Sequence, residues 1–94
     1  MIIVRDVFQA KYGKGGELVA LLKEVLPEMT RSYQRILSDA SGPFFTIVTE
    51  IEVASLAEWE SVIAEAFANP KFGQWFERMV PLVESGRREF YNVE

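Results

Sequence analysis

The stretch FFTIVTEIEVASLAEWE, residues 44–60, decides the fold because its periodicity changes from that of a strand to that of a helix. Phe, Thr, Ile and Val dominate residues 44–53, and these residue types favour strands. Alternation predicts one face that packs on helices and another that is half apolar and half acidic. The first face holds Phe45, Ile47, Thr49, Ile51 and Val53, and the second holds Phe44, Thr46, Val48, Glu50 and Glu52. Ser55 and Glu58 then have the spacing of a capping box, which predicts the start of a helix.

The segments on either side predict three more strands and two more helical stretches. Residues 2–10 and 33–39 are predicted strands, and a turn at 40–43 joins the second of them to residues 44–53 as a hairpin. A helix is predicted from Glu17, ending or kinking near Leu26 because Pro27 cannot donate a backbone hydrogen bond. Asn69 and Pro70 are typical of a new helix start, Gly86 of its left-handed cap, and residues 87–93 of a closing strand.

The predicted order of elements is β-α-β-β-α-(α)-β, and residues 1–94 are expected to form a single domain. Right-handed crossovers place both helical layers on the same side of one antiparallel sheet. The fold class is therefore α+β, a ferredoxin-like βαββαβ sandwich whose four-stranded sheet carries helices on one face.

Composition excludes several kinds of chemistry. The chain has no cysteine and no histidine, which removes disulfides, zinc–thiolate sites and every catalytic arrangement that needs an imidazole. We therefore predict no metal site and no cofactor. The net charge of −4 disfavours nucleic acid as a partner. The opening MIIVRDVFQA is neither a signal sequence nor a membrane span, which predicts no membrane partner and a cytoplasmic location.

The sheet face without helices predicts self-association. Its candidate contact residues are Ile3, Val7, Phe44, Thr46 and Val48, and Phe90 is a further candidate. A monomer rarely leaves a large apolar patch open to water, so we expect two sheets to pair as a homodimeric α/β barrel. The alternative is a monomer with a mixed, solvated face, as many antiparallel sheets have.

Four residues are candidates for a ligand cleft: Arg5, Arg35, Glu50 and Trp75. Glu50 lies in the middle of its strand, where a carboxylate needs a partner, and Arg35 or Arg5 on neighbouring strands can supply one. Such a set orients a polar ligand group or serves as a base, but a structural ion pair is the commoner role. Trp75 lies beside the helical stripe of Phe72, Phe76 and Met79, so it can line a cleft mouth or a partner surface.

Two further features leave alternatives open. Asp6 falls on the apolar face of the first strand, so either a bulge redirects its side chain or a neighbouring strand or helix end donates hydrogen bonds to it. Lys14, Gly15 and Gly16 precede a helix, which is compatible with an anion site but is more typical of a flexible loop.

Three segments resemble the dimeric α+β-barrel superfamily, and within it the NIPSNAP-like and antibiotic-biosynthesis-monooxygenase-like small domains. They are VFQAKYGKGGEL (7–18), YQRILSDASGPFFTIVTEIEVASLAEWE (33–60) and FGQWFERMVPLVESGRREFYNV (72–93). The resemblance implies a homodimer with a ligand-sized cleft between sheet and helices in each protomer. The superfamily includes cofactor-free oxygenases, haem enzymes, isomerases, cyclases and members without a known role. Histidine-dependent haem binding and cyclisation do not carry over, because this chain has no histidine.

Three functions are therefore expected, in this order. The first is a homodimer that binds a small apolar or aromatic molecule in the cleft, with no assigned chemistry. The second is a cofactor-free monooxygenase or isomerase acting on an aromatic or polyketide-like compound. The third is a purely structural self-association module. Whether the chain is an enzyme stays open, since a shared fold is weak evidence for shared chemistry.

Overall fold

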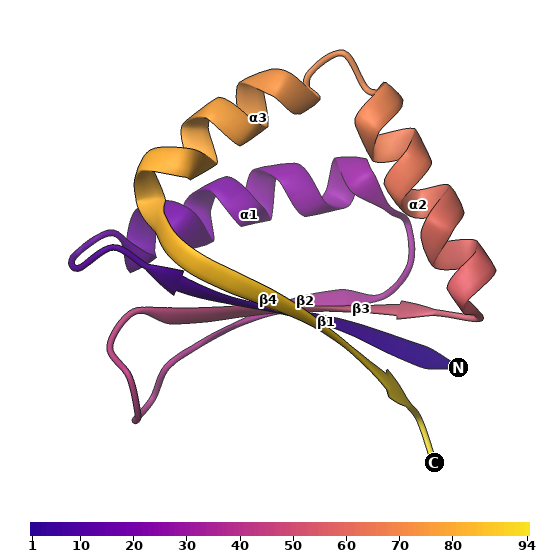
Figure 1. Cartoon of the computed structure of the whole chain (residues 1–94), viewed down its shortest axis with the longest axis horizontal. Coiled ribbons are helices and arrows are strands. Elements are labelled where there is room, and N and C mark those ends of the chain that lie inside the picture. Colours follow the sequence, from indigo (N-terminus) through magenta and orange to yellow (C-terminus); the bar gives the residue numbers. More distant parts are fainter.

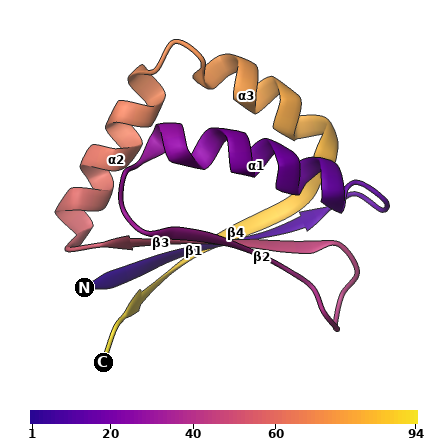
Figure 2. The same cartoon turned by 180° about the vertical axis from the view of Figure 1, so that it is seen from behind.

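A four-stranded antiparallel sheet with helices on one side forms the architecture of the chain (Figure 1), in a computed structural model that describes residues 1–94. The elements in chain order are β1 (Ile2–Ala10), α1 (Gly15–Met29), β2 (Gln34–Ser38), β3 (Thr46–Val53), α2 (Leu56–Ala68), α3 (Phe72–Met79), a short 3-10 turn (Val80–Leu82) and β4 (Val83–Asn92). The strands lie side by side in the order β2-β3-β1-β4. Figures 1 and 2, two opposite views, both place the helices on the same side of the sheet. The ferredoxin-like α+β prediction is confirmed.

The strand-to-helix transition forms as its sequence predicts. The Ser55 hydroxyl accepts a hydrogen bond from the backbone N–H of Glu58 at 3.2 Å. The Glu58 carboxylate in turn accepts one from the backbone N–H of Ala54, one residue before the cap. The first bond satisfies a backbone donor that the start of α2 leaves without a helical partner, and the second fixes the residue before the cap.

The structure corrects several boundaries in the first half of the chain. Helix α1 begins at Gly15, within the segment expected to be a loop, and not at Glu17. Helix α1 continues through Pro27 to Met29, and Thr30 donates its N–H to the Leu26 carbonyl at 3.2 Å. Strand β3 begins at Thr46 and not at Phe44, because Phe45 has a φ of 60° and interrupts the extended chain. Phe44 therefore lies in the connection before β3, 69% exposed, and does not belong to the sheet face to which it was assigned.

The second half of the chain also differs from its prediction. Asn69 accepts a hydrogen bond from the N–H of Lys71 in a turn, and α3 starts only at Phe72. Because Pro81 lacks an N–H, the chain leaves the helix through a 3-10 turn, and β4 begins at Val83. Gly86 is consequently a strand residue opposite Phe8, not a helix cap. A Cβ at Gly86 would lie 3.2 Å from the Phe8 ring.

The hydrophobic core lies between the sheet and α1, and α2 adds to it from one side. Leu18 of α1, Ile47 of β3 and Val4 of β1 are the largest fully buried side chains. Phe90 of β4 pairs with Val4, so it lies on this helix-covered face, and its ring centroid is 6.3 Å from that of Trp59. The expectation that Phe90 belongs to the open face is therefore wrong. None of the helices combines the length and the apolar character that crossing a bilayer requires.

Candidate ligand cavity

A cavity of about 250 Å³ lies between the helix-covered face of the sheet and the helices. Most of its wall is apolar and includes two tryptophans. The lining residues are Asp6, Phe8, Leu21, Leu22, Val25, Leu26, Met29, Thr49, Ile51, Trp59, Ile63, Ala66, Phe67, Phe72, Trp75, Phe76, Met79 and Arg88. Few polar groups interrupt this wall, and they come from the three strands β1, β3 and β4. Apolar walls with a few converging polar groups are typical of sites for small molecules.

An ion pair between Asp6 and Arg88 forms the polar part of the wall. Arg88 donates its Nε–H to Asp6 Oδ1 at 2.7 Å and an Nη2–H to Asp6 Oδ2 at 3.0 Å. The Asp6 side chain is only 16% exposed, and that of Arg88 is 43% exposed. The guanidinium carbon of Arg88 also lies 4.8 Å from the ring centroid of Trp59, a cation–π distance.

The sheet register creates this pair. Asp6 and Arg88 are opposite each other in the antiparallel ladder between β1 and β4, and both side chains point to the helix-covered face. Arg88 therefore supplies the hydrogen bonds for which Asp6 had no assigned donor in the sequence. The hydrogen bonds that Arg88 donates to Asp6, together with the negative charge of Asp6, raise the pKa of Arg88 despite the partial burial of the guanidinium. Arg88 is thus a permanent cation beside the cavity.

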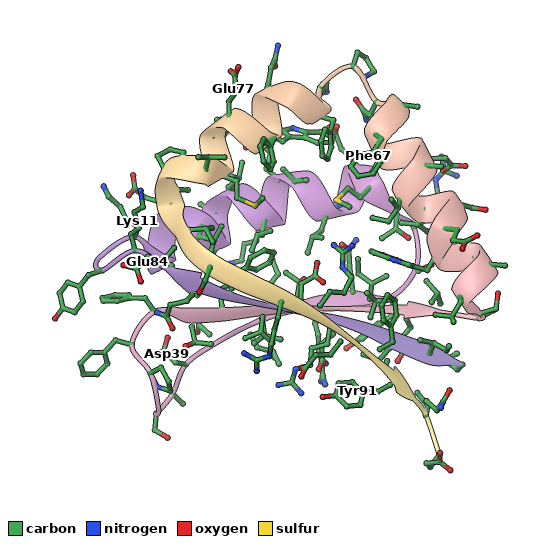
Figure 3. All side chains as sticks on the ribbon, viewed as in Figure 1. Lys11, Asp39, Phe67, Glu77, Glu84 and Tyr91 are labelled. Carbon is green, nitrogen blue, oxygen red and sulfur yellow. The ribbon has the colours of Figure 1, made fainter.

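Three phenylalanines line the cavity where α2 meets α3. The rings of Phe67 and Phe72 meet edge to face with centroids 4.9 Å apart, and Phe76 stacks beside Phe72 at 6.3 Å. Phe67 is 63% exposed although it lines the cavity. Figure 3 shows Phe67 on the helical side of the sheet, next to the turn between α2 and α3. These rings form the mouth of the cavity, and Trp75 is buried deeper in its wall.

The four residues predicted for a ligand cleft divide between the two faces of the sheet. Trp75 lines the cavity, whereas Arg5, Arg35 and Glu50 lie on the opposite, open face of the sheet. Arg35 donates its Nε–H to Glu50 Oε1 at 2.6 Å. Arg5 Nε approaches Glu50 Oε2 to 3.8 Å, close enough for an ion pair but too far for a hydrogen bond, so this buried N–H has no hydrogen-bond partner. The hydrogen bond and charge of Glu50 raise the pKa of Arg35.

The predicted contact residues on the open face keep that position, except for Phe44. Ile3, Val7, Thr46 and Val48 occupy alternating positions that face away from the helices. Val7 and Val48 are already buried within one chain, and with Arg5 and Arg87 they line a hollow of about 650 Å³. Tyr91 lies on the same open side, as Figure 3 shows. The open face is therefore a mixture of apolar and charged groups.

Three polar cavity residues were not among the sequence candidates: Asp6, Thr49 and Arg88. The sequence contains one signal that could have identified Asp6 and Thr49: each is a polar residue on a strand face that is otherwise apolar. Asp6 falls between Val4 and Phe8 on a face that otherwise packs in the core, and Thr49 falls between Ile47 and Ile51 in the same way. Charged or hydroxyl side chains at such positions cost free energy unless they find partners, which makes them candidates for a site.

Comparisons with known proteins give the same fold. No family model and no curated protein matches the chain. Among solved structures, an uncharacterized NIPSNAP domain protein from Burkholderia xenovorans superposes with a TM-score of 0.89 at 18% identity, covering 100% of this chain and 95% of that protein. A NIPSNAP family protein from Agrobacterium tumefaciens has a TM-score of 0.86 at 16% identity, covering 99% and 85% respectively.

A second kind of protein also shares this fold. A candidate antibiotic biosynthesis monooxygenase from Deinococcus radiodurans has a TM-score of 0.72 at 16% identity, covering 100% of this chain and 93% of that protein. Identities this low show the fold and nothing about the activity. The chain thus has the ferredoxin-like fold of NIPSNAP domain proteins and antibiotic-biosynthesis-monooxygenase-like proteins.

Proposed function

We propose that the protein binds a small apolar or aromatic molecule in the cavity between its sheet and helices. The observation that carries this proposal is the combination of an apolar cavity of about 250 Å³ with an Asp6–Arg88 pair in its wall. A cavity made only of core packing would have no need of a cation and a carboxylate. Their polar hydrogens and lone pairs can fix the orientation of a ligand that the apolar wall holds.

The cavity volume limits the size of the ligand. An apolar cavity of about 150 Å³ is enough for benzene, so a cavity of about 250 Å³ accommodates roughly ten non-hydrogen atoms. Larger ligands would extend past Phe67 and Phe76 at the mouth, where exposed aromatic surface is available to cover them. The proposal is therefore for a molecule with one or two rings or a short branched chain.

The test is an NMR titration with p-xylene that follows the indole N–H signals of Trp59 and Trp75. These are the two tryptophans of the chain, and both line the cavity. We expect saturable shifts of both signals. Ala66→Leu, which places a larger side chain in the cavity wall, should abolish them, whereas Ala64→Leu on the exposed face of α2 should not. Unshifted indole signals, or equal behaviour of the two variants, would contradict the proposal.

We further propose that two copies pair through the open sheet face. The surface area of 6059 Å² exceeds the roughly 5,500 Å² typical of a monomer of this mass, which supports an uncovered face. Light scattering should give about twice 10.7 kDa. Val48→Arg on the open face should shift this mass toward the monomer, and Leu56→Arg on the helical side should leave it unchanged. A monomeric wild type would refute the pairing and the self-association function with it.

An enzymatic role is the second candidate, and the likeness to candidate antibiotic biosynthesis monooxygenases favours it. A cofactor-free monooxygenase would consume oxygen with an electron-rich aromatic substrate. Oxygen uptake with a panel of hydroquinones, compared between wild type and Ala66→Leu, tests this role. Uptake that is abolished by the cavity-filling variant would support an enzyme; uptake that is absent or equal in both proteins would leave ligand binding as the function.

A further inference from the structure

We propose that Asp6 makes the cavity selective for a neutral amide-like group over a carboxylate, because it cancels the charge of Arg88 while leaving some of its donors free. This inference rests on the proposed binding function and names the class of ligand that the cavity takes. It makes Asp6 a specificity-determining residue and Arg88 the hydrogen-bond donor.

The hydrogen-bonding inventory of the pair gives the first argument. Arg88 uses Nε and Nη2 on the two oxygens of Asp6, so both hydrogens of Nη1 and the second hydrogen of Nη2 have no acceptor within the protein. The Asp6 oxygens each accept one bond from Arg88 and retain further lone pairs. Both residues line the cavity, so its wall contains one side chain with free donors and one with free acceptor lone pairs. A primary amide, with a carbonyl beside an N–H, matches both.

The charge of the pair gives the second argument. A ligand carboxylate within hydrogen-bond distance of Arg88 would also lie close to the Asp6 carboxylate, since the two side chains are in direct contact. Attraction to one charge and repulsion from the other then nearly cancel. The carboxylate still loses its hydration on entering an apolar cavity, and no net charge compensates for that loss. A neutral amide avoids this loss and keeps both hydrogen bonds.

The surroundings contain no other ionisable group that would change this balance. Asp6 and Arg88 are the only charged residues in the lining of the cavity, and the remaining wall is apolar apart from the hydroxyl of Thr49. The Arg5, Arg35 and Glu50 cluster lies on the other face of the sheet. Charge selectivity in the cavity therefore depends on Asp6 and Arg88 alone.

The experiment compares 4-methylbenzamide with 4-methylbenzoate, two probes of nearly identical shape and of a size that fits the cavity. Binding is followed on the Trp59 and Trp75 indole signals. Wild type should bind the amide at least about tenfold more tightly than the carboxylate, since only the carboxylate loses charge hydration that the neutral Asp6–Arg88 pair does not replace. Asp6→Asn leaves Arg88 without its counter-charge, so its preference should reverse in favour of the carboxylate.

Glu50→Gln is the matched control, because it also removes a carboxylate from an arginine pair but on the open face. It should keep the wild-type preference. Equal or carboxylate-favouring affinity in wild type overturns the inference, as does an Asp6→Asn protein that keeps the preference for the amide. If Asp6→Asn fails to fold, the comparison of the two probes in wild type and in Glu50→Gln decides.

The same titrations separate this inference from the proposed function. If p-xylene binds and the two polar probes bind equally, the charge selectivity is wrong and the cavity function stands. If p-xylene leaves the indole signals unshifted, the proposed function itself is wrong.

Discussion

Replacing Arg88 with Met removes the guanidinium while keeping an unbranched apolar stem of similar length. The variant should lose stability because Asp6, whose side chain is 16% exposed, is left as an uncompensated carboxylate beside an apolar cavity. Two charge-assisted hydrogen bonds, at 2.7 and 3.0 Å, disappear together with the contact to the Trp59 ring.

The size of the effect follows from the geometry and the exposure of the pair. Breaking a buried ion pair by removing one partner costs about 3–5 kcal/mol. Arg88 is 43% exposed, so water screens part of this interaction and the expected loss falls to about 2–3 kcal/mol. For a domain of this size, that loss corresponds to a fall in Tm of about 10–20 °C.

The assay is thermal and urea unfolding followed by circular dichroism. Arg87→Met is the matched control, because Arg87 is the preceding residue of β4, points to the open face and has Glu89, at 3.5 Å, as its ion-pair partner. It should change stability by no more than about 0.5 kcal/mol. The double variant Asp6→Asn with Arg88→Met should be less harmful than the sum of the two single changes by about 1–2 kcal/mol.

Two outcomes would refute this reasoning. If Arg88→Met and Arg87→Met have the same stability, the Asp6–Arg88 pair contributes nothing to the fold. If the effects of Asp6→Asn and Arg88→Met add without any coupling energy, the two side chains do not interact in solution.

Two further predictions concern the packing around Gly86 and the loss of stability at low pH. Gly86→Ala should destabilise the fold by about 1–2 kcal/mol in urea unfolding, because its Cβ would lie 3.2 Å from the Phe8 ring; an unchanged midpoint would mean that Phe8 moves freely. The hydrogen bond from Arg78 lowers the pKa of Glu24 below 4.5, so this pair stabilises the folded state above that pH and the contribution is lost as the pH falls further. Glu24→Gln should therefore lower Tm more at pH 7 than at pH 3; an equal difference at both values would contradict the linkage.

The architecture could be predicted because alternation and capping are local properties. The faces of β3 follow from its period of two, and the start of α2 follows from Ser55 and Glu58. The prediction of β4 was less accurate because Val80 and Val83 continue the apolar stripe of α3 past Pro81. The helical pattern therefore concealed the start of a strand.

The polar wall of the cavity could not be predicted, because it depends on contacts between distant residues. Asp6 and Arg88 are 82 positions apart and meet only through the β1–β4 register. Arg35 and Glu50 were easier to pair, since they face each other across one hairpin. The same alternation that pairs them places them on the open face, away from the cavity. Trp75 was expected beside an apolar stripe of Phe72, Phe76 and Met79, but it is itself the buried residue of α3, whereas Phe76 is 51% exposed.

A crystal structure of the protein under xenon pressure tests the central claim most directly, because xenon occupies accessible apolar cavities and gives a strong anomalous signal. We predict a xenon peak between the sheet and the helices, in contact with Trp75 and Met79. The peak should lie inside the cavity whose wall also contains Asp6 and Arg88. A cavity filled by its own side chains, with no xenon peak on the helical side of the sheet, would contradict the account.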